Sequence, residues 1–148
     1  MVPTNLAGLV AIPQALPHFN LDEQGWALRG YDPVAYFDEN RAIKGSQQFI
    51  TEWEGALWSF ISAENRDLFT NNPETYAPAN GGYCTFGVVL AKKFDGDPNV
   101  WLLHNKRLYV FLNEEVKSQF LQDINDNLAK VESNWPQIKD KSSEALES

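Results

Sequence analysis

Two short aromatic-rich segments restrict the fold of this chain more than any other feature. Residues 49–53 and 56–60 alternate large side chains with other residues, and only Glu54 and Gly55 separate them. Alternating segments joined by two turn residues are typical of a β-hairpin. Aromatic side chains share one face of each predicted strand, so we expect that face of the hairpin to be buried.

A second hairpin is predicted later in the chain. Residues 100–103 and 107–111 form its strands, and Asn105-Lys106 forms its turn. Between the start of the chain and the first hairpin, residues 34–37 are expected to form a short strand or a buried apolar segment. Residues 88–94 are a further strand candidate, partly exposed because Lys92 and Lys93 lie within it.

Helix signals follow each hairpin. Ser62 is expected to cap a helix that runs to about Thr70, and Pro73 to begin another helical turn. Asn113 is expected to cap one long final helix that ends at Trp135, because Pro136 disfavours further helix. The apolar stripe of this helix is Val116, Phe120, Ile124, Leu128 and Val131.

Together these segments predict a small single α+β domain with two β-hairpins, a short helical insert and a long C-terminal helix. Residues 21–136 form the expected domain, residues 1–20 an arm interrupted by prolines, and residues 137–148 a polar tail. No internal repeat is visible in the sequence. The apolar segment 6–16 contains Pro13 and follows no Lys or Arg, so it is not expected to be a signal peptide.

Charge excludes some classes of partner. The 148 residues carry a net charge of −8, and the pI is about 4.7. Without a Lys/Arg cluster to neutralise phosphates, nucleic acid and anionic membrane surfaces are not expected partners. No apolar run approaches the roughly 20 residues that span a bilayer, so membrane insertion is not expected either.

The single cysteine of the chain lies in an unusual setting. Cys84 is placed between glycines and aromatic rings in the segment Asn80–Gly87. The Gly81-Gly82 pair permits positive φ and close approach of the backbone to a ligand or another chain segment. A lone cysteine cannot form an internal disulfide. Its thiol can react, bind a soft metal, or fill a small apolar gap.

Several separated motifs occur in a characteristic order along the chain. They are Gly30–Phe37, Glu52–Phe60, Ser62–Phe69, Pro73–Pro78 and Gly81–Cys84. Together they resemble the YHS domain family over residues 18–136, most closely its stand-alone, mostly bacterial branch. The resemblance implies a distant relation to small treble-clef-like metal domains, with copper as the metal by family association. It also implies a periplasmic or secreted location, although no leader is visible.

The chain departs from the shorter members of that family at three positions. Where their pattern has cysteines, this sequence has Ala35, Ile61 and Asn65. A metal cluster of several thiolates is therefore not expected. Cys84 does match the Gly-Gly-Tyr-Cys motif of the stand-alone branch, in which some relatives carry selenocysteine. This resemblance implies chemistry at position 84.

The candidate site follows from these motifs. Cys84 is the candidate nucleophile, and with His104 it is a candidate ligand pair for copper or zinc. Tyr31, Asp32, Gly81, Gly82 and Tyr83 are the candidate binding residues. Each has a simpler structural interpretation: Asp32 before proline forms a turn, His104 near a hairpin tip lies on the surface, and Cys84 packs in the core.

Three hypotheses about function result. The first is a small YHS-like binding or redox module centred on Cys84, with copper as a candidate ligand. The second is a thiol-dependent, peroxidase-like enzyme that uses Cys84 as its nucleophile. The third is a structural or interaction domain in which Cys84 is buried and inert.

Overall fold

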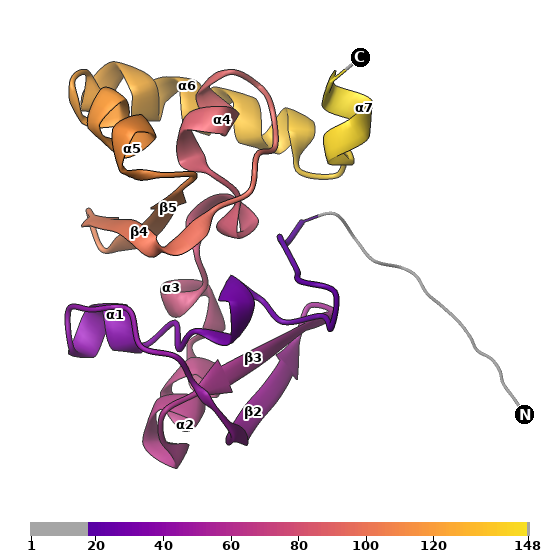
Figure 1. Cartoon of the computed structure of the whole chain (residues 1–148), viewed down its shortest axis with the longest axis vertical. Helices are drawn as coiled ribbons and strands as arrows, with labels where there is room; N and C mark the ends of the chain where they lie inside the picture. Colours follow the sequence, from indigo (N-terminus) through magenta and orange to yellow (C-terminus); the bar gives the residue numbers. More distant parts are fainter. Residues whose placement is uncertain (1–17, 148) are drawn as a thin grey trace, which may run out of the picture.

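The computed structural model describes residues 18–147, which form a mixed α+β domain (Figure 1). The first half contains η1 (Leu28–Gly30), α1 (Ala35–Asp38), β2 (Ser46–Trp53), β3 (Ala56–Phe60), α2 (Ala63–Asn71) and α3 (Pro73–Tyr76). The second contains η2 (Ala79–Gly82), α4 (Thr85–Val89), β4 (Asp97–His104), β5 (Arg107–Phe111), α5 (Glu114–Leu121), α6 (Ile124–Ile138) and α7 (Ser143–Glu147). The fold class predicted from the sequence is thus confirmed.

The first hairpin forms as the alternating pattern predicts. β2 and β3 pair antiparallel, with Trp53 opposite Ala56. Glu54 and Gly55 both have positive φ, which matches the right-handed twist of the strands on either side. Trp58 and Phe60 are fully buried and contact Phe69 of α2, so one face of this hairpin makes the first hydrophobic core.

The second hairpin separates two cores. β4 and β5 also pair antiparallel, and alternate residues of β5 point to opposite sides. Leu108 and Val110 pack into the first core, whereas Phe111 packs with Phe120 of α5 in the second core. In Figure 1 this hairpin lies between β2–β3 at one end of the molecule and helices α4 to α7 at the other.

Both predicted caps are present. The side chain of Ser62 accepts a hydrogen bond from the backbone N–H of Asn65 at the start of α2. The side chain of Asn113 accepts one from the backbone N–H of Val116 at the start of α5. Each bond satisfies an N–H that has no partner within the helix.

The predicted long final helix is wrong in its continuity and in its end. α5 ends at Leu121, and Asp123 leaves the helical region with φ −148° and ψ 58° before α6 begins. The apolar stripe is therefore divided between two helices that both face the second core. α6 continues through Pro136 to Ile138. The proline removes one backbone hydrogen bond of the helix, and burial of Ile138 in the second core compensates that loss.

Two of the predicted strands are also corrected. For residues 34–37 the strand is wrong and the alternative, a buried apolar segment, holds: Val34, Ala35 and Tyr36 are fully buried, and residues 35–38 form the helical turn α1. Residues 85–89 form α4, so no strand spans 88–94. A short apolar segment has no period that separates strand from helix, and here the local turns decide.

Within the described residues, none of the helices has the length and apolar character needed to cross a membrane. The predicted arm lies mostly outside the described residues, which begin at His18. At the other end, the chain beyond α6 includes α7 and contacts the body of the domain through Lys92 and Lys93, which donate hydrogen bonds to backbone carbonyl groups there.

Candidate functional site

The glycine pair before Cys84 lies in a left-handed turn. Asn80, Gly81 and Gly82 have φ of +60°, +64° and +83°. A side chain at Gly81 would stand 1.6 Å from the carbonyl oxygen of His18. The backbone N–H of Asn20 donates to the carbonyl of Gly81 at 2.8 Å. The glycine pair therefore permits a close backbone approach, and the partner is the segment that begins at His18.

Cys84 is fully buried. Its side chain has no exposed surface, and it belongs to the second core together with Val88, Val100 and Phe111. Its backbone N–H donates to the carbonyl of Phe94 at 2.9 Å, which fixes the start of α4. In this position the thiol fills space between α4 and the second hairpin, as a small apolar side chain does.

Asp32 is buried as well, and its carboxylate is saturated with hydrogen bonds. Oδ1 accepts from the backbone N–H groups of Val34 and Ala35, at 2.7 and 3.3 Å. Oδ2 accepts from the backbone N–H of Ile61 at 2.8 Å and from the side-chain amide of Asn65 at 2.9 Å. The carboxylate thus holds the turn that leads into α1 and ties it to the end of the first hairpin and to α2.

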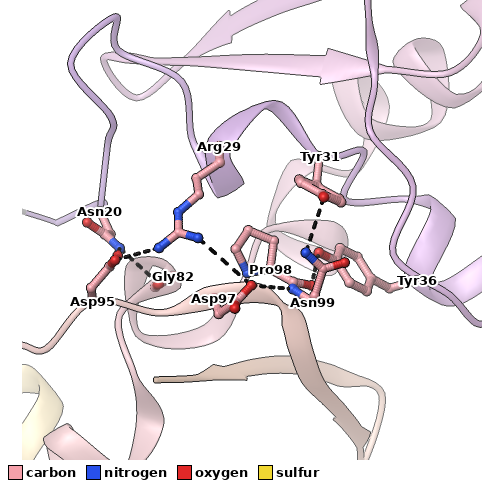
Figure 2. A network of polar contacts seen from close by, with 9 residues as sticks. All are labelled: Asn20, Arg29, Tyr31, Tyr36, Gly82, Asp95, Asp97, Pro98 and Asn99. Atoms are coloured by element: carbon pink, nitrogen blue, oxygen red, sulfur yellow. Dashed lines mark hydrogen bonds and ion pairs between the residues drawn. The ribbon is translucent and has the colours of Figure 1, made fainter. Parts of the chain in front are cut away.

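Tyr31 and its neighbours form a polar network between the two halves of the chain (Figure 2). The side-chain amide of Asn99 donates to the hydroxyl of Tyr31 at 3.1 Å. Arg29 forms an ion pair with Asp95 at 2.5 Å and lies 3.9 Å from Asp97. The hydroxyl of Tyr36 donates to the carbonyl of Pro98 at 2.7 Å. Every one of these contacts joins a residue of the first half to one of the second.

Tyr83 lies on the other side of the glycine turn, against Lys93 and Trp135. The Nζ of Lys93 lies 5.0 Å from the ring centroid of Tyr83 and 5.4 Å from that of Trp135. It also donates to the carbonyls of Lys139 and Lys141, each at 2.7 Å. Burial lowers the pKa of Lys93 to about 8, against the opposing effect of Asp140. Burial raises the pKa of Tyr83, and Glu144 adds to the rise.

The candidate metal ligands lie on different elements. His104 is at the end of β4, opposite Arg107, and is half-buried, whereas Cys84 begins α4 in the second core. From residue 18 to residue 147, no group of three or more His, Cys, Asp and Glu side chains is placed to hold a metal ion. Arg66 forms a partly exposed ion pair with its neighbour Asp67.

An open cleft of about 460 Å³ lies beside the glycine turn. Its aromatic lining residues are Phe19, Trp53 and Trp135. Its charged lining residues include Arg107 at the start of β5, Lys139 after α6, and Glu54 and Glu74 from the first half of the chain. A hollow of about 330 Å³ shares Asn80, Arg107 and Trp135 with it.

The structure therefore divides the predicted site. Gly81 contributes to the lining of the cleft, and Gly82 lines a separate hollow of about 340 Å³ with Arg29 and Asp95. Cys84 and Asp32 are buried without exposed surface. The sequence prediction missed Arg107, Trp135 and Lys139. Each is a single residue at or near the end of an element, and no spacing in the sequence indicates that the fold brings them together.

No family model matches the chain, and no match was found among curated proteins or solved structures.

Proposed function

We propose that this protein is a small YHS-like binding module whose ligand occupies the cleft beside the glycine turn, and that Cys84 has a packing role. The observation that carries the proposal is the composition of the cleft. Aromatic rings and charged side chains of both signs converge there from distant parts of the sequence. In small-molecule sites, a few polar and charged groups fix the orientation of a ligand that contacts aromatic side chains.

The chemistry of the lining indicates a class of ligand. Phe19, Trp53 and Trp135 provide faces for a planar ring. Arg107 and Lys139 suit a carboxylate, and Glu54 and Glu74 suit an ammonium group. A small aromatic zwitterion, such as an aromatic amino acid, carries all three kinds of group. We therefore take aromatic amino acids as the ligand class for the first binding tests.

The test uses L-phenylalanine, with phenylacetate and phenethylamine as probes that each lack one charge. On titration up to about 10 mM, a range suited to ligands of this size, phenylalanine should shift the indole N–H resonances of Trp53 and Trp135. Trp101, which lies outside the cleft lining, should not respond. Each single-charge probe should bind more weakly. Absence of any saturable shift at Trp53 and Trp135 would refute the cleft as the binding site for this class.

A matched pair of variants locates the anion contact. Arg107→Ala should weaken phenylalanine binding about tenfold or more, because a hydrogen bond to a charged group contributes about 1.5–3 kcal/mol. Lys106→Ala, one residue away in the hairpin turn and outside the cleft lining, should leave binding unchanged. Equal effects of the two substitutions would show a general charge effect instead of a contact in the cleft.

The thiol hypotheses have their own test. If Cys84 is a packing residue, alkylation of the native protein is slow, and denaturant accelerates it greatly. Copper(I) affinity should then be the same for the wild type and Cys84→Ser. Rapid labelling of the native thiol, or copper affinity lost in Cys84→Ser, would support the redox or metal-binding module and contradict the packing role.

A further inference from the structure

The two hairpins have the same pairing register. Adding 51 to the residue numbers of every pair in β2–β3 reproduces a pair in β4–β5: Trp53↔Ala56 corresponds to His104↔Arg107, and Ser46↔Phe60 to Asp97↔Phe111. Both ladders also contain an irregularity at the same place, between Ser46 and Ile50 and between Asp97 and Trp101. A shared irregularity is more specific than a shared hairpin, because bulges occur at particular positions.

The turns and helices after the hairpins also correspond at this offset. Glu54 and Gly55 have positive φ, as have Asn105 and Lys106. The caps Ser62 and Asn113 each accept from the backbone N–H three residues later. The helices are followed by Asn72 (φ −143°, ψ 56°) and Asp123 (φ −148°, ψ 58°), which have nearly the same unusual backbone conformation. A new helix begins immediately after each of them.

The correspondence extends to the segments before the hairpins, where the offset is 52 up to Asp32 and Cys84 and is again 51 at Ile43 and Phe94. Leu28, Arg29 and Gly30 form a run of three positive φ values, as do Asn80, Gly81 and Gly82. The backbone bond from Tyr31 to Leu28 has its equivalent from Tyr83 to Asn80. The bond from Asp32 to Ile43 likewise has its equivalent from Cys84 to Phe94. Tyr31 and Tyr83 are thus equivalent, and so are Asp32 and Cys84.

Two glycines and the core aromatics obey the same relation. A side chain at Gly45 would collide with Ser59, and one at Gly96 would collide with Val110, the residue equivalent to Ser59. Two fully buried phenylalanines of the first half have identical and fully buried counterparts in the second: Phe60 corresponds to Phe111, and Phe69 to Phe120. Phe60 contacts Phe69, and Phe111 contacts Phe120, so in each half the two phenylalanines join the hairpin to the helix that follows it.

We infer that the chain consists of two copies of one folding unit, which interact through a head-to-tail interface. We call residues 28–71 unit A and residues 80–122 unit B. The interaction surface of unit B is the outer face of its hairpin: Trp101, Leu103, Leu108 and Val110 pack into the core of unit A. Tyr36 of unit A contacts this face, with its ring centroid 5.2 Å from that of Trp101.

The interface explains where the sequences of the two units differ. The residues of unit A equivalent to this apolar face are Ile50, Glu52, Leu57 and Ser59. Ile50 is 43% exposed and Glu52 is also exposed, whereas Leu57 is half-buried and Ser59 is buried. The segment of Gly25 and Ala27 pairs with Leu57, and no third unit covers this face within residues 18–147. The face between the units is apolar at all four positions, whereas the equivalent face of unit A has Glu52 and Ser59 at two of them. Terminal units of repeat proteins likewise have polar residues on their outer face. Both halves of the chain contribute to the proposed binding cleft, but the inference does not depend on that function.

Circular permutation of the full chain tests the inference. Ser148 is joined to Met1, and new termini are opened between Asn71 and Asn72, after the end of α2, so that unit B precedes unit A. Both residues at the cut are exposed. The control permutant opens the chain between Asn40 and Arg41, which are also exposed but lie inside unit A. Both permutants join the native termini in the same way, so a difference between them reflects only the position of the new termini.

The boundary permutant should retain the native spectrum and a urea midpoint within about 0.5 M of the wild type, and the control should lose about 1 M or more. A boundary permutant that unfolds, or that loses as much as the control, would overturn the inference. Hydrogen exchange on the full-length protein provides a second readout. Phe60→Leu should accelerate exchange mainly in unit A and Phe111→Leu mainly in unit B, whereas uniform acceleration by both would contradict two folding units.

Discussion

At the scale of single residues, Gly81 shows what the glycine motif does. Its φ of +64° alone would tolerate another residue at moderate cost, but its Cα faces the carbonyl oxygen of His18 at a distance that leaves no room for a Cβ. The motif is required because the backbone at Gly81 passes directly against the backbone at His18. Its proximity to Cys84 in the sequence is therefore no sign of thiol chemistry by itself.

Alanine substitutions at Gly81 and Gly55 test this interpretation of the glycine motif. Gly81→Ala should reduce the free energy of unfolding by about 3 kcal/mol or more, because it combines backbone strain with a collision. Gly55→Ala adds a Cβ at φ +76° with no atom within 4 Å, so its loss should stay near 1 kcal/mol. Urea unfolding measures both, and equal losses would show that the His18 segment yields to the new side chain.

Asp32 supports a second prediction at this scale. Asp32→Ala leaves three backbone N–H groups and the amide of Asn65 without their acceptor, so the protein should lose about 3 kcal/mol or more. Asp38→Ala, at the exposed end of the same helical turn, should change stability by less than about 0.5 kcal/mol. Thermal and urea unfolding of both variants check this. A small loss for Asp32→Ala would point away from a structural role and back towards the binding role expected from the sequence.

At the scale of elements, the two capped helices should behave alike. Ser62→Ala and Asn113→Ala each remove one side-chain acceptor at a helix N-terminus, so each should cost about 1 kcal/mol. Ser118→Ala, on an exposed position inside α5, should be neutral or slightly stabilising, because alanine has the higher helix propensity. Chemical unfolding of the three variants measures this. A loss at only one cap would show that the two helices contribute unequally.

At the scale of the whole molecule, Lys93 links pH to stability. Its pKa is about 8 in the folded protein and 10.5 in an unfolded chain, so between these values the unfolded state binds more protons. The free energy of unfolding should therefore rise as pH increases from about 8 towards 10. Above pH 10 the raised pKa values of Tyr83 and Tyr109 act in the opposite direction, since the unfolded chain releases those protons first.

Unfolding free energies measured from pH 7 to 10 test this dependence. Lys93→Met should abolish the rise, although its absolute stability also changes because the carbonyls of Lys139 and Lys141 lose a donor. Lys106→Met, on the exposed tip of the second hairpin, should retain the rise. If the free energy of unfolding of Lys93→Met still rises with pH, a titrating group other than Lys93 causes the rise.

Local signals predicted the elements whose cause is local. The turn residues Glu54-Gly55 and Asn105-Lys106 indicated both hairpins, and Ser62 and Asn113 indicated the helix starts, because a turn or a cap is decided within a few residues. The long helix was mispredicted because its apolar stripe continues through Asp123 at helical spacing. The stripe indicates which side of the segment is buried, but it does not indicate that the backbone changes direction at Asp123.

The amino-acid sequence by itself determined the α+β class, the two hairpins and the helices that follow them, since alternation, turn residues and caps act over short distances. The tertiary structure alone decided that Cys84 is buried, that Asp32 serves as a backbone acceptor, and that Arg107, Trp135 and Lys139 meet in one cleft. It also revealed two equivalent units whose sequences have diverged. Burial and convergence depend on which surfaces cover one another. The face of unit B that packs on unit A is apolar throughout, whereas Glu52 and Ser59 lie at two of the equivalent places in unit A.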